Sequence, residues 1–173
     1  MILANFSILV LRLVVGLTFA AHGAQKAFGW WNGPGPERWQ NAITSMRFRP
    51  AAFWAVLSIG VELVGGLLLA VGLITPLAAT MLIGQEVVII VKAHLPKGFF
   101  TSTGGIEFPL ALLAATIVLL GIGPGAYSVD QLIGFGLAEP VLWLLLVIGL
   151  AGGLGAYALT NMAASREPTP QPR

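Results

Sequence analysis

Several ionisable residues lie inside or beside long apolar runs of this sequence, where charged side chains are normally absent. They are Arg12, His22, Lys26, Glu62, Glu86, Lys92, His94 and Glu107. An uncompensated charge near the middle of a bilayer costs about 2.5–3.5 kcal/mol on insertion scales, so such residues usually pair or face a cavity or proton path. Apolar surroundings favour the protonated form of a carboxyl group, and histidine or lysine can donate a hydrogen bond to a carbonyl oxygen. These residue types therefore predict ligand binding or proton exchange inside a membrane.

The composition places the chain among integral membrane proteins. Of its 173 residues, 57% are hydrophobic and 9% are charged, whereas an ordinary soluble domain has about 25% charged residues. Residues 108–129 and 140–165 contain no charged side chain, and each run can supply the roughly 20 residues that cross a bilayer as a helix. No strand-like alternation competes with these runs, so we predict an all-α membrane protein that contacts the lipid bilayer.

Other classes of site are disfavoured. The sequence contains no cysteine, which excludes a thiol redox pair, a thiolate zinc site and a cysteine-bound iron–sulfur cluster. Two histidines without a third ligand are a weak metal signal, so we expect no metal site and no covalently bound cofactor. The net charge of +2 comes from basic residues at predicted membrane loops, and we therefore expect no nucleic-acid partner.

The apolar runs predict five membrane spans. One span is expected at residues 2–28, two in a helical hairpin at residues 51–98, one at residues 105–122 and one at residues 140–163. The hairpin is expected to reverse near Gly72 and Pro76, because glycine and proline end helices.

Shorter segments connect these spans. Between the first two spans, Trp39, Ile43 and Met46 recur at helical spacing and predict an interfacial helix. A second interfacial segment is expected near residues 126–139.

The predicted spans and loops divide the chain into three parts. Residues 1–133 form a bundle of four transmembrane helices, built from two tandem helical hairpins. Residues 134–164 add a fifth, C-terminal transmembrane helix. The tail at residues 165–173 is polar and proline-rich, and we expect it to be disordered.

The basic residues predict the orientation of the chain. Eight of the nine lie in loops or helix ends on the side opposite the N-terminus: Lys26, Arg38, Arg47, Arg49, Lys92, Lys97, Arg166 and Arg173. Cytoplasmic loops carry an excess of lysine and arginine. We therefore expect a multi-pass plasma-membrane protein with its N-terminus outside and its C-terminus in the cytoplasm.

Short motifs suggest that the two hairpins repeat one another. His22 and His94 each precede a lysine and a phenylalanine at the end of a span, and Glu62 and Glu107 each end an S/T-x-G-x-E sequence. Two hairpins of the same orientation would be related by a pseudo-twofold axis along the membrane normal, as in some transporters. Chance similarity of short motifs is the alternative.

The repeat predicts two polar layers. Arg12 precedes His22 by ten residues and Glu86 precedes His94 by eight, which is a depth difference of about 3 Å. We therefore expect an ion pair between Arg12 and Glu86.

The second polar layer consists of His22, Glu62, His94 and Glu107. We expect these four residues to line a cavity on the cytoplasmic side. The alternatives are that Arg12 and Glu86 form a purely structural pair and that the histidines are ordinary interfacial residues.

The motifs together resemble the DoxX family over about residues 8–133. They are R-L-x-x-G from Arg12, H-G-x-Q-K from His22, E-x-x-G-G from Glu62, G-G-x-E ending at Glu107, and G-P-G-x-Y-S-x-D ending at Asp130. The resemblance implies a four-helix membrane core, a plasma-membrane location and a link to oxidoreductases. The related DoxD subunit belongs to a thiosulfate:quinone oxidoreductase, and mycobacterial relatives partner a superoxide dismutase and a sulfurtransferase. The fifth span lies outside the usual pattern.

These observations leave three functions open. In the first, the chain is a small membrane subunit of a redox system that interacts with quinone and with a soluble or membrane redox enzyme. Its catalytic candidates are His22, Glu62, His94 and Glu107, and its ligand-binding candidates are Arg12, Lys26 and Glu86. The second function is a non-enzymatic anchor, scaffold or assembly factor, and the third is a transporter of protons or a small solute. The substrate and any homo-oligomer are left open.

Overall fold

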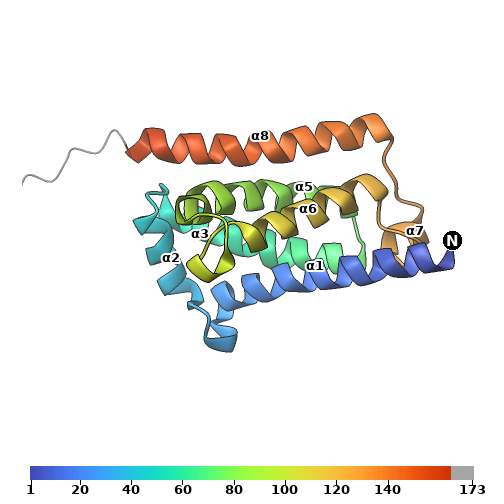
Figure 1. Cartoon of the computed structure of the whole chain (residues 1–173), viewed down its shortest axis with the longest axis horizontal. Coiled ribbons are helices and arrows are strands. Elements are labelled where there is room, and N and C mark those ends of the chain that lie inside the picture. Colours follow the sequence, from blue (N-terminus) through green and yellow to red (C-terminus); the bar gives the residue numbers. More distant parts are fainter. Residues whose placement is uncertain (165–173) are drawn as a thin grey trace, which may run out of the picture.

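The computed structural model describes residues 1–164, and the predicted disordered tail lies outside the described residues. Within residues 1–164 the chain is helical and contains no strand. Figure 1 shows long helices running side by side, with the N-terminus at one end of the bundle and helix α2 at the other. The predicted all-α membrane architecture is confirmed.

The first span is α1 (Ile2–Phe28). It ends where Gly29 adopts a left-handed conformation, with φ 72°, and donates its N–H to the Gln25 carbonyl. A 3-10 turn, η1 (Trp30–Asn32), leads into α2 (Gly35–Ser45). Helix α2 is amphipathic, and Ile43 on its inner face is buried. A helix is therefore present where the sequence predicts one, and its position at the membrane interface stays a prediction.

The second and third spans form the predicted hairpin. The second span is one continuous helix made of α3 (Ala51–Gly60), the π-helical turn η2 (Val61–Gly65) and α4 (Gly66–Val71). The third span consists of α5 (Thr75–Ile89), the π-helical turn η3 (Ile90–His94) and the 3-10 turn η4 (Leu95–Lys97). Gly72 makes the reversal between them with φ 70°, a conformation that a glycine adopts without strain.

The remaining helices are η5 (Thr101–Thr103), α6 (Glu107–Ile122), α7 (Val129–Ile133) and α8 (Glu139–Ala164). Four described helical segments are long and apolar enough to cross a membrane: Ile2–Phe28, Ala51–Val71, Thr75–Lys97 and Glu139–Met162. Helix α6 has 16 residues and is about 24 Å long, whereas a typical hydrocarbon core is about 30 Å thick. A fifth crossing by α6 therefore stays a prediction.

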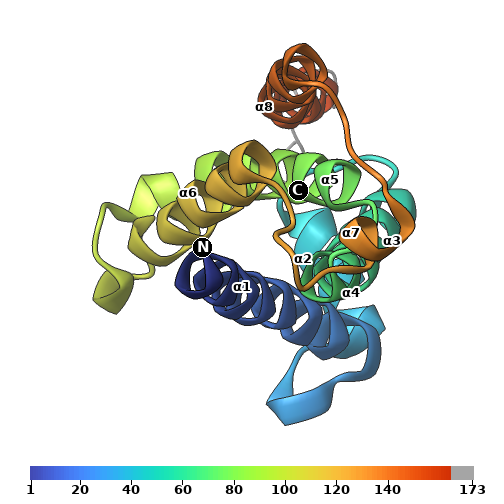
Figure 2. The same cartoon turned by 90° about the vertical axis from the view of Figure 1, so that its right-hand side faces the viewer.

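Small residues let the helices approach closely. A Cβ atom at Gly16 of α1 would lie 2.5 Å from the Ala70 backbone nitrogen of α4, and one at Gly153 of α8 would lie 2.5 Å from the Gly84 carbonyl oxygen of α5. Such contacts drive association in membranes, where helices gain little from hydrophobic burial. Figure 2 shows α8 outside the group formed by the other helices, next to α5.

Candidate functional site

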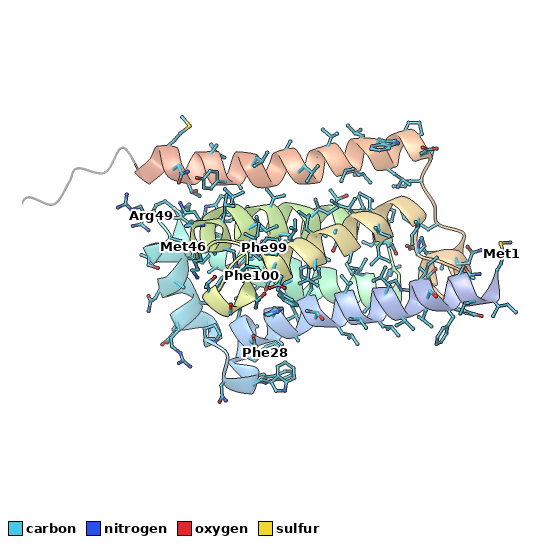
Figure 3. All side chains as sticks on the ribbon, in the orientation of Figure 1. Met1, Phe28, Met46, Arg49, Phe99 and Phe100 are labelled. Carbon is cyan, nitrogen blue, oxygen red and sulfur yellow. The ribbon has the colours of Figure 1, made fainter. Side chains whose placement is uncertain are left out.

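A cavity of about 380 Å³ opens at one end of the bundle, between α1, α2, α3, α5, η3 and α6. We call this end the basic end, because it carries the described basic residues Lys26, Arg38, Arg47, Arg49, Lys92 and Lys97. Figure 3 shows Phe28, Met46, Arg49, Phe99 and Phe100 at this end and Met1 at the other. Most of the cavity wall is apolar. Its polar side chains are His22, Lys26, Ser58, Glu62, Gln85, Glu86, Lys92, His94 and Thr101.

A buried ion pair lies in the wall of the cavity. Lys26, in the last turn of α1, donates hydrogen bonds to both carboxylate oxygens of Glu62. Glu62 is 1% exposed and lies in the π-helical turn η2. Gln85 of α5 donates to the same carboxylate, with Nε2 3.1 Å from Oε1. Together with Gln85, the pair therefore joins three helices. The apolar runs of the sequence mark Lys26 and Glu62 but do not pair them.

Helix α2 covers this ion pair through Trp39. The Nζ atom of Lys26 lies 4.2 Å from the centroid of the Trp39 ring, within the range of a cation–π interaction. The indole N–H of Trp39 donates to Ser58 Oγ at 2.8 Å. The helical spacing predicted the inner face of α2, but no sequence signal connected Trp39 to Lys26.

Glu86 is the second buried carboxyl group in the cavity wall. It lies in α5, is 3% exposed and lines the cavity. Its Oε2 is enclosed without a hydrogen-bond partner in the part of the chain that the structure describes. Because a carboxyl oxygen in an apolar protein interior normally has a partner, this atom is an unsatisfied position in the site.

Arg12 is not a partner of Glu86, so the predicted ion pair is wrong. Its Nε donates to the Ala70 carbonyl at 3.0 Å, and its two terminal nitrogens donate to the carbonyls of Pro124 and Tyr127. Glu62, which shares the cavity with Glu86, lies eight residues before Ala70, about 12 Å along the same helix. Arg12 therefore belongs to the opposite end of the bundle.

The prediction failed because the two histidines are not equivalent depth markers. Helix α1 continues beyond His22 to Phe28, whereas His94 is the last residue of η3 and joins a 3-10 turn. Residue counts back from the two histidines therefore do not measure depth from the same level. The carboxylate whose charge acts on the Arg12 guanidinium group is instead Asp130 in α7.

Asp130, which in the sequence stands out only as part of a motif, has structural contacts in the fold. It is fully buried, and its carboxylate accepts hydrogen bonds from the backbone N–H groups of Ile74 at 2.6 Å and Thr75 at 2.8 Å. It thus caps the start of α5, where free N–H groups attract negative charge. The Gly72 carbonyl in turn accepts from the Asp130 N–H at 2.7 Å.

The two histidines both line the cavity, as predicted, but their surroundings differ. His22 is exposed and faces Phe108, with ring centroids 6.2 Å apart. The Nδ1 atom of His94 lies 2.7 Å from the Gly104 carbonyl and 3.2 Å from the Gly105 carbonyl. Since a carbonyl only accepts, Nδ1 carries the proton, and His94 fastens the loop after η4 to the third span.

Glu107 lies outside the cavity, so the prediction that it lines the same cavity as Glu62 is wrong. Its side chain is exposed, and its Oε2 accepts a hydrogen bond from the Thr101 N–H at 2.9 Å. Glu62 lies within a continuous helix, but Glu107 is the first residue of α6 and turns toward the preceding loop. The similar motifs therefore occupy unlike places.

Lys92 connects the cavity to α8. Its Nζ donates to Asn161 Oδ1 at 2.8 Å and lies 5.5 Å from the centroid of the Tyr157 ring. Both partners belong to α8, so the additional helix contributes to the surroundings of the site. Within residues 1–164, no group of three or more His, Asp or Glu side chains is placed to hold a metal ion.

Comparison with known proteins identifies relatives of the chain. The family model described as DoxX matches residues 7–95. Over 135 residues the chain is 34% identical to the "Uncharacterized membrane protein Rv3486" of Mycobacterium tuberculosis, and the match covers 72% of this chain and 80% of that protein. No solved structure matches the chain. The segment that matches the DoxX family model includes Lys26, Glu62 and Glu86 but ends before Glu107.

Proposed function

The chain belongs to the DoxX family, and from this premise we propose that it is a small membrane subunit of a redox system that binds a quinone in the cavity at the basic end. The observation that carries the proposal is the combination of an apolar cavity wall with two buried carboxyl groups, Glu62 and Glu86. A quinone has the matching chemistry, because its ring carries two carbonyl oxygens and its tail is apolar.

The cavity has the features of a site for such a molecule. Ligand pockets are commonly apolar, with a small number of placed polar groups that orient the ligand. Phe19, Trp39, Phe48, Trp54 and Phe108 contribute rings to the wall. In this proposal the chain carries no electron carrier of its own, and a partner enzyme at the basic end supplies or receives electrons.

The first experiment tests whether the cavity holds quinone. The protein is purified from its membrane in mild detergent, and the extracted small molecules are identified by mass spectrometry. Ala93→Trp places an indole at the cavity wall, and Ala114→Trp, on an exposed position of α6, is the matched control. We expect quinone with the wild type and the control and a clear loss with Ala93→Trp. Equal quinone in all three proteins would contradict binding in this cavity.

A scaffold without a ligand is the second candidate. It is favoured because two cations already have partners within the chain: the buried Arg12 binds backbone carbonyls, and the partly buried Lys26 binds Glu62. Exposed aromatic residues at the basic end, among them Trp31 and Phe100, could contact a partner or the lipid interface. Reconstitution with a copurified redox enzyme separates the two functions, because quinone-dependent turnover that requires an open cavity is expected only of the quinone-binding subunit.

A further inference from the structure

Glu86 has an unfilled hydrogen-bonding position next to the cavity. Glu86 is 3% exposed, and it contributes to the cavity wall. Among residues 1–164, nothing forms a hydrogen bond with its Oε2. Buried polar atoms are nearly always hydrogen-bonded in folded proteins. Oε2 itself is enclosed, but the Glu86 side chain lines the cavity, so a rotation of the carboxyl group would bring this atom to a molecule that enters there.

The neighbouring polar side chains are engaged elsewhere. Glu62 and Lys26 are the charged groups that act on Glu86, and they bind one another. Gln85 directs its amide N–H₂ group to Glu62. Turning Lys26 or Gln85 toward Glu86 would break contacts of the buried Glu62 carboxylate. The site thus contains one satisfied carboxylate and one carboxyl group that is left for a ligand.

We propose that Glu86 is the residue that binds the head-group oxygen of the quinone, while the Lys26–Glu62 pair stays intact and shapes the wall beside it. This inference rests on the proposed function. A carboxyl group can donate a hydrogen bond to a quinone carbonyl when it is protonated, and it can accept one from a quinol hydroxyl when it is ionised. The same side chain therefore suits both forms of the ligand. Glu62, committed to Lys26 and Gln85, does not take this role.

The test measures binding of decylubiquinone and of its reduced form to the purified full chain in detergent. Trp39 and Trp54 line the cavity, so quenching of tryptophan fluorescence reports occupation. The variants are Glu86→Leu, which removes the polar group, and Glu86→Gln, which keeps a donor and an acceptor. Glu139→Leu, at an exposed carboxyl group outside the cavity, is the control.

We expect Glu86→Leu to bind about tenfold more weakly than the wild type, which is the usual effect of losing one buried hydrogen bond. Glu86→Gln should stay within about threefold of the wild type, because its amide replaces the hydrogen bond, and Glu139→Leu should be unchanged. If Glu86→Leu is not recovered as a monodisperse protein, Glu86→Met replaces it, since methionine also lacks a strong hydrogen-bonding group.

Two results would overturn the inference in different ways. Wild-type affinity in Glu86→Leu, or an equal loss in Glu86→Gln and Glu86→Leu, would show that Glu86 does not hydrogen-bond the head group, while the quinone site would stand. No quenching of the wild type by either form of the probe would overturn the proposed function, and the inference with it.

Discussion

The buried Arg12 and the partly buried Lys26 are satisfied by different kinds of partner. Lys26 binds a carboxylate, whereas Arg12 binds the carbonyls of Ala70, Pro124 and Tyr127. The planar guanidinium group suits Arg12, because its several N–H donors are fixed in different directions. Arg12 thereby ties α1 to α4 and to the segment before α7, and these contacts predict a structural role.

Removing Arg12 should destabilise the fold. We expect Arg12→Leu to lower the free energy of unfolding by about 3 kcal/mol, because it leaves three carbonyl oxygens at the turn end of the bundle without their donor. Arg12→Lys should also destabilise, since one ammonium group cannot replace the planar fork. Arg38→Leu, on the exposed face of α2, is the control. Unfolding in detergent measures the change, and wild-type stability of Arg12→Leu would contradict this role.

Two double-mutant cycles should distinguish the observed Lys26–Glu62 pair from the Arg12–Glu86 pair that the sequence predicted. Lys26→Met and Glu62→Gln should be coupled by about 0.5–3 kcal/mol, because each variant removes one member of a contacting pair. Arg12→Leu and Glu86→Gln should be additive within about 0.5 kcal/mol, as expected for separated sites. Chemical or thermal unfolding of the single and double variants gives both values. Strong coupling between the Arg12 and Glu86 variants would contradict the structure and support the ion pair that the sequence predicted.

At the scale of the elements, α8 joins the bundle through glycines and one polar contact. Gly149 and Gly153 of α8 approach α5 backbone atoms, and Asn161 accepts a hydrogen bond from Lys92. This is close packing by small residues combined with an interhelical hydrogen bond. The spacing of Gly149 and Gly153 was visible in the sequence, but their partner Gly84 was not.

A larger side chain at Gly153 should separate α8 from α5. We expect Gly153→Leu to lower stability by about 1–3 kcal/mol, the usual effect of overpacking, because its Cβ would meet the Gly84 carbonyl and Val87. The adjacent Gly152→Leu is a matched control, since nothing lies within 4 Å of a Cβ there. Unfolding measurements and protease cleavage between α7 and α8 report the effect. Equal behaviour of the two variants would contradict the packing.

At the scale of the whole molecule, the two ends of the bundle differ in their polar groups. The basic end holds the cavity and the Lys26–Glu62 pair. The opposite end holds the contacts of Arg12 and Asp130 that close the turns after α4 and α6. The cavity and the contacts that stabilise the turns thus lie at opposite ends of the bundle.

The orientation of the bundle can be tested with reporter fusions. We expect a fusion after Arg173 and one after Gly98 to be active only as cytoplasmic reporters, because the basic loops should face the cytoplasm. A fusion in residues 123–128 should be active only outside, if α6 crosses the membrane. Cytoplasmic activity at residues 123–128 would show that α6 does not cross. External activity after both Gly98 and Arg173 would show that the topology is inverted.

The sequence by itself determined the class, most helix boundaries and the reversal at Gly72, because apolar length, glycine and proline act locally along the chain. It also selected His22, Lys26, Glu62, Glu86 and His94, since ionisable residues in apolar runs are conspicuous without any knowledge of their neighbours. All five line the cavity. Their catalytic and binding roles stay predictions.

Only the tertiary structure decided which of these groups meet. Each residue along an α-helix advances the chain by about 1.5 Å and turns it by about 100°, so a small error in the relative depth of two helices changes every partner. Close contacts such as that of Gly16 with Ala70 set this depth in the folded bundle. They place Arg12 at backbone carbonyls, Lys26 at Glu62 and Trp39 over Lys26. Hydropathy does not encode these depths, because it records how apolar a segment is and not how far it slides against its neighbour.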